Sequence, residues 1–501
     1  MTTRPISRDD ERALTKATTN GALISYGTFA VAKLVTFAVT IVVARALLPS
    51  QMGVMSLALL VTNYVDALNE FGISSAVVWF ERDDEVSRST AFWVDMAFGL
   101  GATLLVVALA GPLAAFFREP SLAPVLRVLS LSFLFTSIGS VHAAVLRRRI
   151  DFRRQIGPEV SRSLSKGALT IVLVGAGLGV WSLVWGQLLG ALVGSVWFIV
   201  ALRWWPSATF DRAIAKTMTR YGATVAGVTF LAVVLKDVDY LVVGRRLGSR
   251  DLGLYTLGFR LPDLAVMGIC YAVSNAVFPA LSRLRADAPS LRRGVVRGLG
   301  ALSLITAPLG VLLSVYATDL VAAFYGPRWE ATGRVLTYIS IYFVASSGSF
   351  VIGDLYKATN RTGILNIIAI ARLPLSLVAL IMVAPRGIVA VAVCQMSLAS
   401  FTFVLQLVVA CRVTPLSGRD LLGAFTPALV VCALTLVVGI VGIALVDGGP
   451  WPTLLISGTV TAAVSASAAI AIGRRWWRGI DRPTPLEAEP AVRPELLDEA
   501  R

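Results

Sequence analysis

Long apolar stretches recur along almost the whole chain. An α-helix needs about 20 mostly apolar residues to cross the hydrocarbon core of a bilayer. Because lipid offers no partners to backbone polar groups, each such stretch is predicted to be a membrane-spanning helix. The expected fold is an all-α polytopic membrane protein. Its fourteen predicted spans are 20–44, 51–71, 91–116, 122–146, 157–177, 180–202, 221–244, 252–281, 298–317, 331–355, 363–384, 387–411, 420–445 and 451–473.

Composition agrees with this reading and excludes several other classes of protein. Of the 501 residues, 56 % are apolar and 15 % are charged, whereas soluble domains average about 25 % charged residues. The four cysteines lie far apart without a CxxC pair, and His142 is the one histidine. These counts do not indicate a zinc site, a redox pair or a catalytic triad. We therefore expect no cofactor, no metal and no catalytic residue.

The distribution of basic residues predicts the direction of the chain. With a cytoplasmic N-terminus, 30 of the 45 Lys and Arg residues fall in cytoplasmic segments and 7 in outer loops. Basic residues concentrate on the cytoplasmic side of membrane proteins, so both termini are expected in the cytoplasm. The net charge of +15 then reflects topology and contact with anionic lipids, and nucleic acid is not needed as a partner.

The sequence repeats itself at an offset of about 200 residues. Residues 41–57 align with 241–257, which pairs Arg45 with Arg245 and Gly53 with Gly253. An even number of spans between copies predicts two parallel six-helix lobes around a central site, as in some transporters. The expected divisions are a cytoplasmic segment (1–19), an N-lobe with spans one to six (20–204), a linker (205–220), a C-lobe with spans seven to twelve (221–412), two extra spans (413–473) and a disordered cytoplasmic tail (474–501).

Charged residues inside the spans are the strongest indication of a site, since a cation at mid-bilayer costs about 2.5–3.5 kcal/mol. Lys33 lies midway along the first span with no acidic residue nearby in sequence. Polar residues otherwise gather on spans two, seven and eight, which a two-lobe transporter would place at its centre. Glu159, Arg162 and Lys166 share one helical face near the start of span five, where either an ion-paired face or a cavity mouth fits.

Four short motifs resemble those of the bacterial polysaccharide repeat-unit flippases. They are FGISSA at 71–76, LRRRIDF at 146–152, FPALS at 278–282 and FYGPRW at 324–329. These flippases are the Wzx-like members of the multidrug/oligosaccharidyl-lipid/polysaccharide exporter superfamily, and the chain is most similar to the colanic-acid-exporter-like branch. The similarity covers roughly residues 10–412, with the last two spans matching in hydropathy alone.

The resemblance implies a transporter rather than an enzyme. Its cargo would be an oligosaccharide on undecaprenyl diphosphate, flipped to the outer leaflet of the plasma membrane for surface or exopolysaccharide synthesis. A single chain would suffice as a monomer, with a polysaccharide polymerase complex as a candidate partner. By position, we expect diphosphate contacts from Lys33, Lys236 and Arg260, polar or sugar contacts from Asn63, Tyr64, Tyr240, Tyr271, Ser274 and Asn275, and ion coupling through Asp66, Glu70, Asp237, Asp239 or Asp263.

Two other functions stay open from the sequence. Acidic residues such as Asp66 and Asp237 suit a cation-coupled small-molecule or drug exporter of the same superfamily. A membrane glycosyltransferase or polymerase is disfavoured, because the chain has no long outer loop and no metal-ligand cluster.

Overall fold

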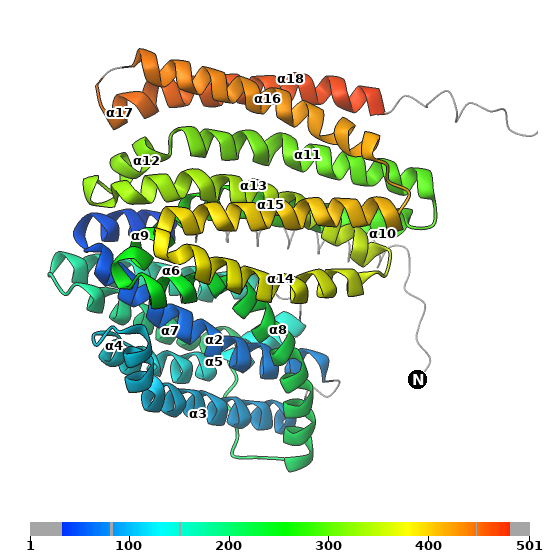
Figure 1. The fold of residues 1–501 in the computed structure, drawn as a ribbon. Coiled ribbons are helices and arrows are strands. Elements are labelled where there is room, and N and C mark those ends of the chain that lie inside the picture. Colours follow the sequence, from blue (N-terminus) through cyan, green and yellow to red (C-terminus); the bar gives the residue numbers. More distant parts are fainter. Residues whose placement is uncertain (1–32, 81–83, 150–151, 447, 481–501) are drawn as a thin grey trace, which may run out of the picture. The chain divides into compact units, whose positions relative to one another are not determined.

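The computed structural model describes residues 33–80, 84–149, 152–446 and 448–480. Within these ranges, the side chains of a few helical residues, among them Glu70, are not described. Every regular element in the described residues is helical (Figure 1). The fold class predicted from the apolar stretches is therefore confirmed.

Ten helical segments of the described residues are long and apolar enough to cross a membrane. Three of the other predicted spans fall on α2, α6 and α8, which have 31, 24 and 35 residues. The last, 20–44, lies mostly outside the described residues. The number fourteen thus stays a prediction, while the multi-pass membrane class is clear.

The helices form two compact units that interleave along the chain. The first unit comprises residues 1–264, 317–339 and 367–398, and the second comprises 265–316, 340–366 and 399–501. The six-helix lobes expected from the repeat stay a prediction.

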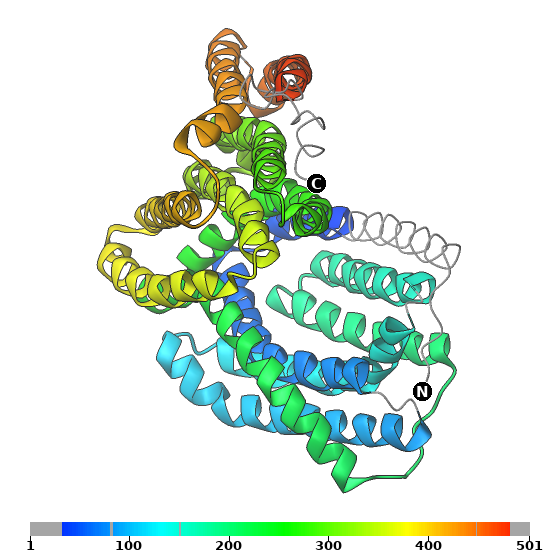
Figure 2. The same ribbon diagram turned by 90° about the vertical axis from the view of Figure 1, so that its right-hand side faces the viewer.

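The first unit is built mainly from the N-terminal half of the chain. Its helix pairs α2 and α8, α2 and α9, and α6 and α7 pack against one another (Figures 1 and 2). Its elements are a helix over 33–46, α2 (Pro49–Trp79), α3 (Glu85–Phe117), α4 (Leu122–Leu129), α5 (Leu131–Arg148), α6 (Phe152–Gly175), α7 (Val180–Leu202), α8 (Arg212–Arg246), α9 (Ser249–Pro262), α12 (Ala317–Phe324), η2 (Pro327–Trp329) and η3 (Ala384–Arg386).

The second unit contains α11, α16 and α18, which pack together. The Tyr316 hydroxyl joins this group through hydrogen bonds of 2.5 Å to Ser457 Oγ and 2.9 Å to Thr461 Oγ1. Its elements are α10 (Gly268–Leu284), α11 (Ala288–Val315), α16 (Gly418–Leu445), α17 (Pro450–Pro452), η4 (Thr453–Gly458) and α18 (Thr459–Ile480). Four elements are divided between the units, namely η1 (Asp263–Met267), α13 (Glu330–Ala358), α14 (Thr362–Val383) and α15 (Ile388–Val413).

The two sequence repeats contact each other inside the first unit, where α2 crosses α9. Ser56 Oγ lies 3.1 Å from Thr256 Oγ1, and these two residues are equivalent in the repeat. A Cβ added at Gly53 would lie 1.6 Å from the Ser249 carbonyl oxygen, and one at Gly253 would lie 2.0 Å from the Pro49 carbonyl oxygen. The contacts are thus reciprocal, and glycine at both positions lets the two backbones approach closely.

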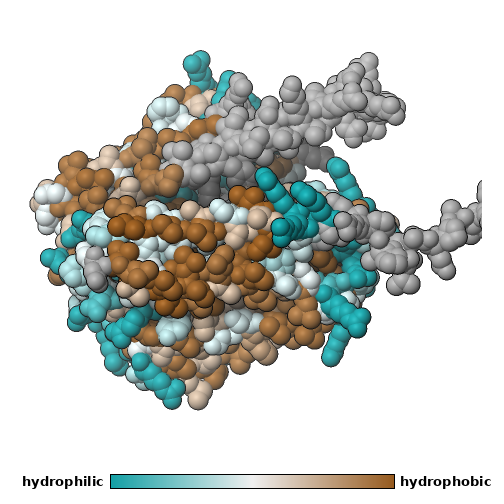
Figure 3. Space-filling view, turned by 90° about the horizontal axis from the view of Figure 1, so that it is seen from above, coloured by the Kyte–Doolittle hydropathy of each residue, from teal (hydrophilic) through white to brown (hydrophobic). Residues whose placement is uncertain are grey.

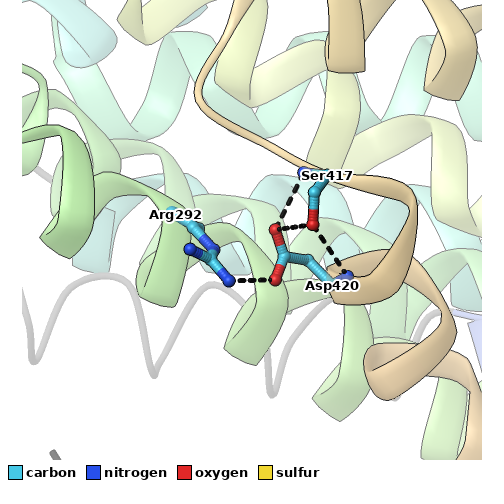
Figure 4. A network of polar contacts seen from close by, with 3 residues as sticks. All are labelled: Arg292, Ser417 and Asp420. Carbon is cyan, nitrogen blue, oxygen red and sulfur yellow. Dashed lines mark hydrogen bonds and ion pairs between the residues drawn. The ribbon is translucent and has the colours of Figure 1, made fainter. Parts of the chain in front are cut away.

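A polar network fixes the start of α16 in the second unit (Figure 4). The Asp420 carboxylate accepts a hydrogen bond of 2.8 Å from the Ser417 backbone N–H, and the Asp420 backbone N–H donates to Ser417 Oγ at 3.4 Å, which together form a capping box. The Ser417 hydroxyl also donates to the same carboxylate oxygen at 2.8 Å. The other carboxylate oxygen of Asp420 lies 2.6 Å from an Arg292 guanidinium nitrogen of α11. One carboxylate therefore both caps α16 and ties it to α11.

Large apolar side chains are exposed along the spans, as expected for surfaces that face lipid. On α16, Leu429 is 63 % exposed and Val437 is 59 % exposed. Figure 3 shows one face on which hydrophobic residues fill the middle and hydrophilic residues gather at the two ends. Such an arrangement matches a hydrocarbon core between two headgroup layers.

Two predicted boundaries differ from the helices observed. The linker expected at 205–220 is partly helical, because Asp211 caps α8 through its side chain and α8 begins at Arg212. The tail expected to begin at 474 starts with helix, since α18 continues to Ile480. Trp476 explains the extension, because its indole N–H donates to the Gly423 carbonyl oxygen at 3.0 Å. The residues after 480, like the N-terminal segment 1–19, lie outside the described ranges.

Candidate functional site

An ion pair joins two of the predicted site residues across 230 positions of sequence. Lys33 Nζ lies 3.1 Å from Asp263 Oδ2, and their side chains are 39 % and 37 % exposed. Asp263 opens the π-helical turn η1 directly after Pro262 ends α9. Proline removes a backbone donor, and π-turns often accompany functional positions. Asp263 thus lies where the α-helix is interrupted, and it pairs with Lys33, which has no acidic residue nearby in sequence.

A second cluster surrounds two buried acids of α8. Asp239 is 2 % exposed and accepts a hydrogen bond of 2.8 Å from the Tyr255 hydroxyl. Asp237 is 7 % exposed, and both carboxylates lie within electrostatic range of Tyr64 on α2. The Tyr240 ring packs edge-on against Tyr255 with centroids 5.9 Å apart. Tyr255 was not among the predicted site residues. It lies on α9, 16 residues after Asp239 of α8, so the contact joins two helices.

A third cluster consists of cations. Arg162 and Arg260 both lie within electrostatic range of Lys166. Neither Arg162 nor Lys166 forms an ion pair with any described residue, so the ion-paired reading of this α6 face is not supported. The candidate set from the sequence contained Arg260 but lacked its two α6 neighbours. A signal for them existed in α7, where glycine recurs every four residues at 186, 190 and 194.

The other residues of the first unit are more dispersed. Lys236 and Asn63 are exposed, and Lys236 lies within electrostatic range of Asp237. Asp66 is half-buried and has polar neighbours. The side chain of Glu70 is outside the described part of the chain.

Three predicted polar residues belong to the second unit, on α10. Ser274 donates a hydrogen bond of 2.5 Å to Asp354, which is 1 % exposed and also pairs with Lys357 at 3.1 Å. The Tyr271 ring packs edge-on against Phe350 at 5.5 Å, and Asn275 is exposed. The Ser274 hydroxyl thus has an internal partner that the sequence did not predict.

Comparison with known proteins places the chain in a family. Residues 42–334 match the model of the family described as polysaccharide biosynthesis protein, and the chain belongs to this family. Its relatives include the lipopolysaccharide biosynthesis protein WzxC of Escherichia coli, 23 % identical over 64 % of this chain and 66 % of that protein. The succinoglycan biosynthesis transport protein ExoT of Rhizobium meliloti is 24 % identical over 60 % of this chain and 61 % of that protein. The match spans less than two thirds of either relative.

Solved structures show which fold the helices adopt. The lipid II flippase MurJ in an inward closed conformation has a TM-score of 0.72 and 15 % identity, covering 92 % of this chain and all of that one. An inward-facing multidrug resistance transporter of the MATE family has a TM-score of 0.59 and 15 % identity, covering 76 % of this chain and 95 % of that one. The chain therefore has the fold shared by these two kinds of transporter.

Proposed function

We propose that the protein is a flippase. It moves an oligosaccharide repeat unit on undecaprenyl diphosphate from the inner to the outer leaflet of the plasma membrane, by alternating access and without chemical change. Membership of the polysaccharide biosynthesis family carries this proposal. The fold is compatible with it, since a lipid II flippase shares that fold.

The diphosphate is the part of the cargo that needs protein groups most. Its charge would lose solvation in hydrocarbon, and Lys or Arg side chains can replace the lost water. Lys33, Lys236 and Arg260 are exposed or half-exposed cations of the first unit, which suits this role. An incoming diphosphate would compete with Asp263 for Lys33.

The sugar groups need weaker and more numerous contacts. Asn63 and Asn275 offer exposed amides, and Tyr271 offers a ring that is 51 % exposed. Tyr64 and Tyr240 are partly buried and are assigned to the same role. Ser274 would first have to release Asp354.

Ion coupling is assigned to the buried acids of α8. Asp239 is almost fully buried, and the Tyr255 hydroxyl and the Gln395 side chain lie against its carboxylate. A buried acid in a transporter suits the binding of a proton or a metal cation. Asp66, Glu70 and Asp263 remain the other candidates for this role.

The cellular setting follows from the cargo. Both chain termini are placed in the cytoplasm of a bacterium, with basic cytoplasmic loops against anionic lipids. The flippase acts as a monomer and delivers its cargo to a polysaccharide polymerase complex on the outer side.

Complementation of a flippase-null strain tests the proposal in cells. The unaltered gene should restore the surface glycan, and Lys33→Glu or Arg260→Glu should abolish restoration while leaving the membrane protein level unchanged. Full activity of both variants would contradict the assignment of Lys33 and Arg260 to the cargo site. Failure of the unaltered gene to restore the glycan in its own host would contradict the flippase function.

A second candidate function is cation-coupled export of a small molecule. The observation that favours it is the pair of buried acids, Asp237 and Asp239, in a fold shared with a multidrug transporter. Drug susceptibility of a deletion strain separates the two candidates. Increased susceptibility with an intact surface glycan would favour the exporter.

A further inference from the structure

The cations of α6 pack against glycines of the neighbouring helix α7. Arg162 and Lys166 are four residues apart and so lie on one helical face. A Cβ added at Gly190 would come 2.9 Å from Lys166 Cβ, and one at Gly194 would come 3.2 Å from Arg162 Cβ. The stems of both side chains therefore pack directly onto the backbone of α7. This packing restricts the positions that their charged groups can take.

No acid of the described residues forms an ion pair with this group, although Glu159 lines the same small cavity as Arg162. Lys166 has two electrostatic neighbours, Arg162 on its own helix and Arg260 on α9, and both are cations. The charged groups of Arg162, Lys166 and Arg260 form no hydrogen bond or ion pair with another described residue. Like charges held near one another repel each other, and an anion placed among them relieves that repulsion.

Tyr325 adds an unsatisfied polar group near the same place. It is 2 % exposed, its hydroxyl has no hydrogen-bond partner in the described part of the chain, and it lies within electrostatic range of Arg260. Buried hydroxyl groups are normally hydrogen-bonded. A donor of this kind suits an oxygen-rich anion.

The other two cations predicted to contact the diphosphate, Lys33 and Lys236, each have an acidic neighbour. Lys33 is paired with Asp263 at 3.1 Å, and Lys236 has Asp237 as an electrostatic neighbour. Arg162, Lys166 and Arg260, in contrast, have no acidic ion-pair partner among the described residues. An anion with several charges and several acceptor oxygens fits three cations better than a single carboxylate does.

We propose that Arg162 and Lys166, together with Arg260, form the site that binds the diphosphate group of the polyprenyl-linked cargo. This inference rests on the proposed flippase function and adds to it two residues of α6. The three cations hold the diphosphate, and Lys33 contributes once Asp263 has released it.

Binding of farnesyl diphosphate to the purified full chain in detergent tests the inference, with farnesol as the probe that lacks the anion. The unaltered protein should bind the diphosphate and not the alcohol. Arg162→Gln and Lys166→Gln should each weaken binding by about 10-fold or more, the loss expected for one charge-assisted hydrogen bond. Lys166→Arg should retain most of the affinity because it retains the charge.

The controls separate a lost site from a lost fold. Lys216→Gln removes an exposed cation near the start of α8 and should leave affinity unchanged. Thermal melting of each variant shows whether it is folded, and unchanged affinity in a folded Arg162→Gln/Lys166→Gln double variant would overturn the inference. Absence of binding by the unaltered protein would also overturn it. Complementation by the unaltered gene would then still support the flippase function, so the two failures are distinguishable.

Discussion

At the scale of single residues, the sequence identified charges correctly but could not pair them. Lys33 stood out because no acid lies near it in sequence, yet its partner Asp263 is 230 positions away. The charges within one span do not show which residues of other spans will lie beside them in the folded protein. The same holds for Ser274, whose buried partner Asp354 belongs to another span.

The Lys33–Asp263 pair allows an asymmetric test. Partly exposed ion pairs contribute about 0–1 kcal/mol to stability, so neither Lys33→Gln nor Asp263→Asn should lower the melting temperature much. If Lys33 binds cargo, Lys33→Gln should reduce flipping by about 10-fold or more, while Asp263→Asn should reduce it far less. Initial rates of glycan export measure both. Equal losses would contradict the assignment of cargo binding to Lys33 without a comparable role for Asp263.

The Asp420 network allows a stability test with a matched control. Asp420→Asn removes the ion pair to Arg292 and weakens the cap of α16. Losing a helix cap costs about 0.5–2 kcal/mol, so the melting temperature in detergent should fall. Asp287 occupies the N-cap position of α11 with no capping hydrogen bond from its side chain among the described residues. Asp287→Asn should therefore have little effect, and equal shifts would contradict this assignment.

At the scale of helices, the sequence repeat predicted which positions of α2 and α9 are equivalent. The alignment of Gly53 with Gly253 predicted equivalent positions, and the structure places both at the crossing of α2 and α9. The alignment could not predict that the two copies would contact each other through these residues. Repeat symmetry specifies which positions correspond, whereas packing of the spans decides which of them meet.

Substitution at this crossing should destabilise the protein. A Cβ at residue 253 would lie 2.0 Å from the Pro49 carbonyl oxygen, so Gly253→Ala forces the helices apart. Overpacking typically costs about 1–3 kcal/mol. Gly101→Ala is the control, because its Cβ would meet nothing within 4 Å. Thermal melting should show a loss for Gly253→Ala alone, and a neutral result there would contradict the close crossing.

A disulfide across the same crossing tests whether it moves during transport. Ser56→Cys/Thr256→Cys would place two thiols where the hydroxyls now lie 3.1 Å apart, so oxidation should form a bond. If α2 and α9 separate in each cycle, the oxidised variant should flip cargo at one tenth of the normal rate or less. A tenfold loss of rate corresponds to about 1.4 kcal/mol of activation free energy. Reductant should restore it. The single variants under the same oxidant are the control, and full activity with the bond formed would show that this crossing stays closed.

The polar helices were the hardest elements to interpret. Arg162 and Lys166 on α6 suited an ion-paired face as well as a cavity mouth, because spacing alone does not show what faces them. The structure shows glycines of α7 against their stems and another cation, Arg260, near Lys166. That information lies in the packing of α6 on α7 and in the proximity of Arg260, which no single helix contains.

At the scale of the whole molecule, the sequence was most informative. Repeated apolar stretches predicted a multi-pass helical protein, and the motifs at 71–76 and 278–282 indicated the polysaccharide flippases. The family match over residues 42–334 agrees with that assignment. What the sequence could not supply is the set of neighbours that each charged residue of the spans has in the fold.

Flipping in reconstituted vesicles tests the central claim most directly. The purified full chain is placed in liposomes that contain a fluorescent undecaprenyl-diphosphate-linked oligosaccharide, and its exposure on the opposite leaflet is followed with a membrane-impermeant quencher. The account predicts that the protein speeds exposure well above that in empty liposomes and that the Arg162→Gln/Lys166→Gln double variant does so poorly. Exposure no faster than in empty liposomes, with protein shown to be folded and inserted, would contradict it.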